Sequence, residues 1–126
     1  MIIFFLLSEN ILFVGDSHTK GYFGENLKKI LTQSNNTVKV LAEVGSGVDY
    51  WTKDKNFIDQ VKNTDEVIIA LGTNDFASYR KCQNKTICFE KKIKTMLDLI
   101  PPEKNVHGLD HHNIKKALLK TFLTLM

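Results

Sequence analysis

The apolar and polar positions of this chain alternate between two patterns over most of its length. Short continuous apolar runs predict strands at 11–14 and 67–71, and β-branched residues that alternate with Lys39 predict another at 38–42. Apolar residues three or four positions apart predict helices at about 21–33, 57–61, 89–100 and 114–122. Strands that alternate with helices in this way form a parallel sheet with helices on both faces. The pattern therefore predicts an α/β protein with a three-layer α/β/α sandwich.

Size and composition indicate one ordinary globular domain. The 126 residues predict a single domain over 1–126, with 43% apolar and 25% charged residues. The net charge of +3 is mild, and no aromatic residues are interleaved with the lysines, so we do not expect nucleic acid as a partner. No apolar stretch reaches the roughly 18 residues of a stable membrane span. The sequence gives no indication of the oligomeric state.

The sequence allows two interpretations of the cellular compartment in which the protein is found. The apolar segment 1–7 lacks a basic start and a clear cleavage signal, which favours a lead-in to the first strand over an export signal. A cytoplasmic location is slightly favoured for this reason. Cys82 and Cys88 are then two free thiols, whereas an exported chain could join them in a local disulfide.

Three loops carry the candidate chemistry, and each follows a predicted strand. They read Gly-Asp-Ser at 15–17, Gly-Ser-Gly at 45–47 and Gly-Thr-Asn-Asp at 72–75. In an open parallel sheet, ligands bind at the carboxyl ends of the strands. We therefore expect the three loops to meet on one rim of the sheet.

The residue types on this rim suit acyl transfer. Ser17 is the candidate nucleophile, and a serine hydroxyl needs an adjacent base to be effective. The backbone N–H groups that follow Ser17, the side-chain amide of Asn74 and a backbone N–H of Gly45 or Gly47 are candidate oxyanion donors. Asp16 has a simpler interpretation as a residue that caps the turn by accepting backbone N–H groups.

These blocks resemble the SGNH (GDSL-type) hydrolases. The resemblance covers residues 10–100 and implies a flavodoxin-like fold that hydrolyses esters through an acyl-serine intermediate, without a cofactor or metal. By this resemblance Ser17 is the nucleophile and first oxyanion donor, and Asn74 is the third donor. Gly45 is favoured as the second donor because Trp51 then falls where related sequences often carry an aromatic residue. Asp16, Gly47 and Asp75 are expected to support the site.

The last family block matches less well. The family ends in Asp-x-x-His before its final helix, and His107 is the best candidate for this base, but Lys104 occupies the position of the aspartate. His111 and His112 are the alternatives. Only 33 residues separate Asn74 from His107, which is short for the family and predicts an incomplete fold that lacks a strand and a helix.

Two other functions remain open at this stage. The chain could be a catalytically impaired remnant of the fold that binds a ligand or a partner. A metal site built from the three histidines and Asp110 is less favoured, because Gly108 interrupts the helix that their spacing would need.

The expected substrate is an acyl ester of a small molecule, a carbohydrate or a lipid. The candidates for its lining are His18, Trp51 and Tyr79, although Trp51 fits a place in the core equally well. The sequence does not distinguish hydrolysis from acyl transfer to another acceptor, because both share the acyl-serine intermediate.

Overall fold

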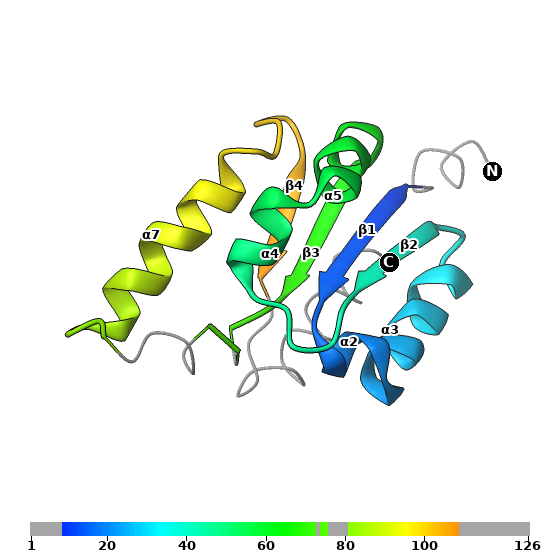
Figure 1. The fold of residues 1–126 in the computed structure, drawn as a ribbon. Coiled ribbons are helices and arrows are strands. Elements are labelled where there is room, and N and C mark those ends of the chain that lie inside the picture. Colours follow the sequence, from blue (N-terminus) through cyan, green and yellow to red (C-terminus); the bar gives the residue numbers. More distant parts are fainter. Residues whose placement is uncertain (1–8, 73, 76–80, 109–126) are drawn as a thin grey trace.

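The computed structural model describes residues 9–72, 74–75 and 81–108, and its ribbon is drawn in Figure 1. Four strands form one sheet: β1 (Asn10–Gly15), β2 (Thr37–Ala42), β3 (Glu66–Ala70) and β4 (Asn105–Gly108). The helices are α2 (Ser17–Lys20), α3 (Tyr22–Gln33), α4 (Val48–Lys53), α5 (Lys55–Gln60), the 3₁₀ turn η1 (Val61–Asn63) and α7 (Lys85–Leu97).

The sheet is parallel throughout and has the order β2-β1-β3-β4. These are the first four positions of the flavodoxin-like order. Gly15 at the end of β1 pairs with Ala42 of β2 and with Ala70 of β3, so the three strands end level with one another. The loops that follow them therefore leave the same rim, as the sequence predicted.

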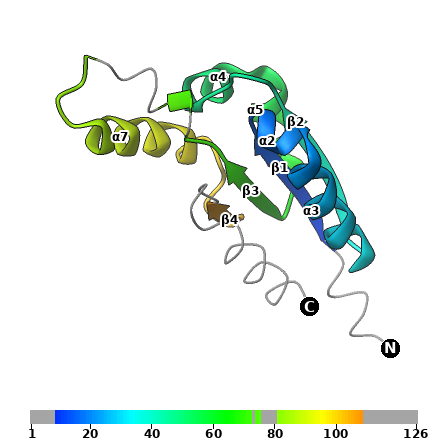
Figure 2. The same cartoon turned by 90° about the horizontal axis from the view of Figure 1, so that it is seen from below.

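Helices cover both faces of the sheet, which confirms the three-layer prediction (Figure 2). On one face, Leu27 and Leu31 of α3 pack against Ile11, Phe13 and Ile68. The other face is covered by α4, α5, η1 and α7. Its buried residues form the larger core cluster, which includes Leu12, Val14, Val48, Trp51, Phe57, Val61, Val67, Ile69 and Met96. Alternate residues of β1 and β3 pack into the two core clusters, because successive side chains of a strand point to opposite sides of the sheet.

The helices differ from the sequence prediction in their boundaries. The helix expected at about 21–33 is preceded by the separate short helix α2, and Gly21 lies between α2 and α3. The helix expected around 57–61 is α5 with η1, and α4 precedes it. Asp54 separates α4 from α5, and its side chain caps α5 by accepting a hydrogen bond from the N–H of Phe57 at 2.9 Å.

The fourth strand is the main addition to the sequence analysis. Residues 105–108 pair with β3, and Ile68 lies opposite His107. The sequence predicts no strand here, because a four-residue strand with mostly exposed residues shows no apolar run. The helix predicted at 114–122 lies outside the described residues. Within the described part of the chain, no helix has the length and apolar character needed to cross a membrane.

Candidate active site

Hydrogen bonds tie together the three loops at the carboxyl rim. The hydroxyl of Ser46 donates to the carbonyl of Gly15 at 3.2 Å, which joins the second loop to the end of β1. The side-chain amide of Asn74 donates to the carbonyl of Ser46 at 3.0 Å, and Asp75 accepts a hydrogen bond from the N–H of Val48 at 2.9 Å. The loops after β1, β2 and β3 therefore form one connected assembly.

Ser17 lies at a tight turn between β1 and α2. Asp16 is 3% exposed and its carboxylate accepts a hydrogen bond from the N–H of His18 at 3.0 Å, which is the capping role that the sequence suggested. A Cβ on Gly15 would lie 1.8 Å from the hydroxyl oxygen of Thr19, so only glycine lets α2 fold back this closely. Ser17 is the first residue of α2 and is exposed. A strand end, a buried cap and a glycine together hold an accessible serine at the rim.

The two glycines of the second loop have different structural roles. Gly45 is exposed and has a φ of +77°, a left-handed conformation that favours glycine. Gly47 lies against the third loop, because a Cβ there would lie 2.7 Å from a carboxylate oxygen of Asp75. Asp75 is itself only 3% exposed. Gly47 thus permits the close approach of two loops, while Gly45 presents its backbone at the surface.

Trp51 belongs to the core and does not line an open crevice. Its side chain is 3% exposed, and its ring packs edge to face against Phe57 and Tyr50. The indole N–H donates to the hydroxyl of Ser46 at 3.1 Å. Of the two places that the sequence left open for Trp51, this arrangement favours the core, since the ring is buried against Phe57 and supports the loop through Ser46. His18 is exposed beside Ser17, and Tyr79 lies outside the described residues.

The structure does not bring His107 to Ser17. The Nε2 atom of His107 lies 3.4 Å from a carboxylate oxygen of Glu66, which is 4% exposed and starts β3. Glu66 pairs with Ile11, and Ile11 is four residues, or about 13 Å of strand, before Gly15. The imidazole is therefore directed toward the amino end of the sheet, away from the rim where Ser17 lies. The prediction that His107 is the catalytic base gains no support from this arrangement.

Glu9 interacts electrostatically with this imidazole and with two neighbouring acids, Glu66 and Asp65. The pKa of the half-buried Glu9 is raised from 4.5 to about 7, first by burial and then by the neighbouring carboxylates of Glu66 and Asp65. His107 partly opposes this rise in the pKa of Glu9, because a protonated imidazole favours a neighbouring carboxylate. The pair of Glu66 and His107 thus belongs to an electrostatic cluster at the amino end of the sheet.

Other candidate groups lie apart from the rim. Within residues 9–72, 74–75 and 81–108 there is no cluster of three or more His, Cys, Asp or Glu side chains that could hold a metal ion. His111, His112 and Asp110 lie outside these residues. Cys82 and Cys88 are joined in a disulfide at the start of α7, which is the second of the two states that the sequence left open.

Ser46 is the residue that sequence reasoning missed. It is 4% exposed and contacts Gly15, Trp51 and Asn74 through its hydroxyl and carbonyl oxygens. A serine between two glycines gives no sequence signal for such a role, since the same triplet occurs in solvated turns. The buried Trp51 five residues later is the one hint that this loop turns inward.

Comparison with known proteins shows an SGNH-like fold. No family model and no curated protein sequence matches the chain. A lipase from a goat rumen metagenome has a TM-score of 0.62 at 17% identity, over 92% of this chain and 73% of that one. A family 3 carbohydrate esterase from Clostridium thermocellum has a TM-score of 0.60 at 18% identity, over 94% and 69% of the two chains. The lipase/acylhydrolase from Enterococcus faecalis has a TM-score of 0.58 at 20% identity, over 92% and 70%.

Proposed function

We propose that this protein is a serine hydrolase that cleaves ester bonds. The observation that carries the proposal is the connected rim. Ser46 is hydrogen-bonded to Gly15, two residues before the exposed Ser17, and Asn74 is hydrogen-bonded to Ser46. Solved structures of similar fold are described as lipases and carbohydrate esterases, which supports the same class of reaction. The substrate is accordingly an acyl ester.

In the proposed reaction, the Ser17 hydroxyl oxygen attacks the ester carbonyl carbon, and its proton passes to a histidine base. The carbonyl oxygen becomes an oxyanion, which accepts hydrogen bonds from the backbone N–H groups of Ser17 and Gly45 and from the amide of Asn74. The C–O bond then breaks, and the alcohol leaves with the proton held by the base. Water attacks the acyl-serine in a second cycle of the same steps and releases the acid.

The base proposed here is His111 or His112 in place of His107. Gly108 ends β4 next to Ile69, one position before the end of β3, so the chain leaves the sheet on the side of the catalytic rim. His111 follows three residues later, within about 10 Å of Gly108 along an extended chain. A base that follows β4 leaves the contact between His107 and Glu66 in place. His107 itself would have to break this contact to act as the base.

Steady-state hydrolysis of p-nitrophenyl esters tests the nucleophile. Ser17→Ala is expected to lower kcat/KM by at least about 10³-fold, because the covalent step is lost. Ser34→Ala is the matched control, since Ser34 caps the far end of α3 and lies away from the rim. Equal activity of the two variants, or loss of activity in both with folding intact, contradicts Ser17 as the nucleophile.

The oxyanion donor is tested by Asn74→Ala against Asn26→Ala on the exposed side of α3. Removal of one such donor costs about 10²- to 10³-fold in kcat, and the control is expected to change kcat by less than twofold. A fall in KM with unchanged kcat for Asn74→Ala argues against the role.

The base is tested with three single histidine variants. His107→Gln is expected to retain activity, whereas His111→Ala or His112→Ala is expected to lower kcat by at least about 10²-fold. Loss of activity in His107→Gln alone, with an unchanged circular dichroism spectrum, refutes the assignment.

A catalytically impaired binding protein is the second candidate. The distance between His107 and the rim favours it, since the best-matching histidine does not reach the serine. The two candidates give different results in the ester assay, because a binding protein shows no hydrolysis that depends on Ser17.

A further inference from the structure

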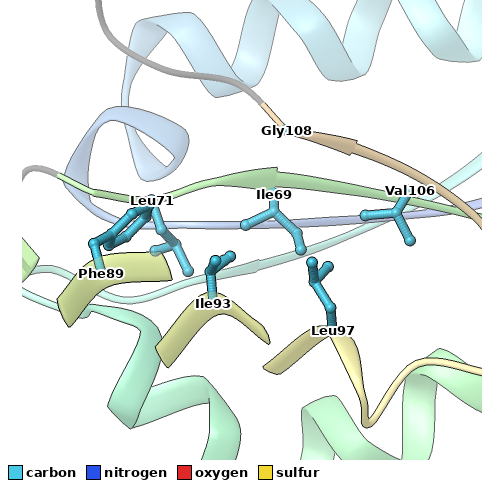
Figure 3. Close-up of a pocket in the computed structure, with 7 residues that line it drawn as sticks. All are labelled: Ile69, Leu71, Phe89, Ile93, Leu97, Val106 and Gly108. Atoms are coloured by element: carbon cyan, nitrogen blue, oxygen red, sulfur yellow. The ribbon is translucent and has the colours of Figure 1, made fainter. Parts of the chain in front are cut away.

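An apolar groove begins next to the candidate active site. It has a volume of about 460 Å³ and lies between the sheet and α7 (Figure 3). Its walls are Ile69 and Leu71 from β3 and the loop after it, Phe89, Ile93 and Leu97 from α7, and Val106 from β4. The side chains named here carry no polar groups. A volume of this size is within the range of small-molecule sites.

One end of the groove adjoins the rim. Leu71 directly precedes Gly72 and is three residues before Asn74, the candidate oxyanion donor. The ring of Phe89 lies beside Gly72 at this end, because it would be 3.9 Å from a Cβ on Gly72. Figure 3 places Leu71 and Phe89 at one end, and Leu97 and Val106 at the other. The groove therefore runs from the catalytic rim along the face of the sheet.

We propose that this groove binds the hydrocarbon chain of a medium-length acyl ester, with the ester carbonyl at the rim. This inference rests on the proposed ester hydrolysis and names its substrate class. The eight residue steps of α7 from Phe89 to Leu97 span about 12 Å. An extended chain advances roughly 1.2 Å per bond, so this length fits an acyl chain of about ten carbons.

The chemistry of the walls favours an acyl chain over a carbohydrate. A sugar hydroxyl placed among these six side chains would lose its hydrogen bonds to water without finding new partners on them. A methylene group gains from the same transfer, and each one buried raises affinity by about fourfold. The outer side chains Leu97 and Val106 are 39% and 38% exposed, which leaves apolar surface for a ligand to cover.

Decanoate binding to the full chain tests the groove independently of catalysis. Isothermal titration calorimetry is expected to detect decanoate binding to the wild-type protein, and Leu97→Trp is expected to weaken it by at least tenfold because the indole occupies the groove. Ile87→Trp is the matched control, since Ile87 is also an exposed apolar residue of α7 but does not line the groove. Val106→Phe serves as a second blocking variant should Leu97→Trp fail to fold.

The ester assay adds a separate measurement. The ratio of kcat/KM for p-nitrophenyl decanoate to that for p-nitrophenyl acetate is expected to exceed ten in the wild-type protein and in Ile87→Trp, and to fall at least tenfold in Leu97→Trp. No decanoate binding to the wild-type protein, or equal binding by both tryptophan variants, overturns the inference. Sedimentation that shows a dimer lost in Leu97→Trp also overturns it, since a second copy then fills the groove.

These results separate the two proposals. Hydrolysis of p-nitrophenyl acetate that depends on Ser17, without groove-dependent binding of decanoate, contradicts the acyl groove and leaves the proposed ester hydrolysis intact. Groove-dependent binding of decanoate without hydrolysis of any ester contradicts the proposed ester hydrolysis and leaves the groove as a site that binds fatty acids.

Discussion

The close contact between Gly47 and Asp75 gives a sharp prediction about how the rim is held together. A Cβ at position 47 would lie 2.7 Å from Oδ1 of Asp75, and the ordinary contact distance begins near 3.4 Å. The same oxygen accepts the hydrogen bond from the N–H of Val48 at 2.9 Å. The carboxylate is only 3% exposed, so it has little room to move aside while this bond is kept.

Gly47→Ala is therefore expected to break the bond between Val48 and Asp75. Loss of a buried hydrogen bond to a charged group costs about 1.5–3 kcal/mol. Gly21→Ala is the matched control, because Gly21 also precedes a helix with extended backbone and the added Cβ would meet its nearest neighbour at an ordinary 3.4 Å. Both variants share the small cost of replacing glycine at a helix N-cap, so this cost cancels between them.

Urea denaturation followed by circular dichroism measures the difference. The free energy of unfolding of Gly47→Ala is expected to be lower than that of Gly21→Ala by about 1.5–3 kcal/mol, with unchanged m-values. The ester hydrolysis of Gly47→Ala is also expected to fall, since Asn74 is held by the same loops. A difference in stability below about 0.5 kcal/mol refutes the reasoning, because the carboxylate then moves aside at no cost.

Two further predictions concern Trp51, which supports the loop at 45–47, and Glu9, which lies at the amino end of the sheet. Trp51→Phe removes the indole N–H that donates to the buried hydroxyl of Ser46. Urea denaturation is expected to show a free energy of unfolding that is lower by about 1–3 kcal/mol. A change below about 0.5 kcal/mol contradicts this role of the hydrogen bond. Because the pKa of Glu9 is raised to about 7 in the folded protein, the unfolded chain releases this proton first as the pH rises from 4.5 to about 7. Stability from Glu9 is therefore present below pH 4.5 and is lost as the pH rises toward 7. Glu9→Gln is expected to flatten this part of the stability profile, and identical profiles for both proteins contradict the shifted pKa.

Much of the fold followed from the sequence because its two central strands, β1 and β3, contain continuous apolar runs. Residues 11–14 and 67–71 are buried on both faces, and such segments leave a clear pattern. That the loops bearing Ser17 and Asn74 leave the same rim followed from the parallel order, since loops after parallel strands leave the same edge.

The remaining features depended on tertiary contacts that leave little trace in the sequence. The strand at 105–108 is short and mostly exposed, so its pairing with β3 determines its structure, and this pairing directs His107 toward Glu66. The role of Trp51 depended on one hydrogen bond to Ser46, because an aromatic residue near a loop suits a ligand or a core equally well.

The proposal that Ser17 is a nucleophile is tested most directly by labelling with a fluorophosphonate probe, which reacts with activated serines. Between pH 6 and 9 we expect one covalent adduct, mapped by peptide mass spectrometry to Ser17, and the same adduct in His107→Gln. Absence of an adduct over this pH range, or an adduct at another residue, contradicts the account.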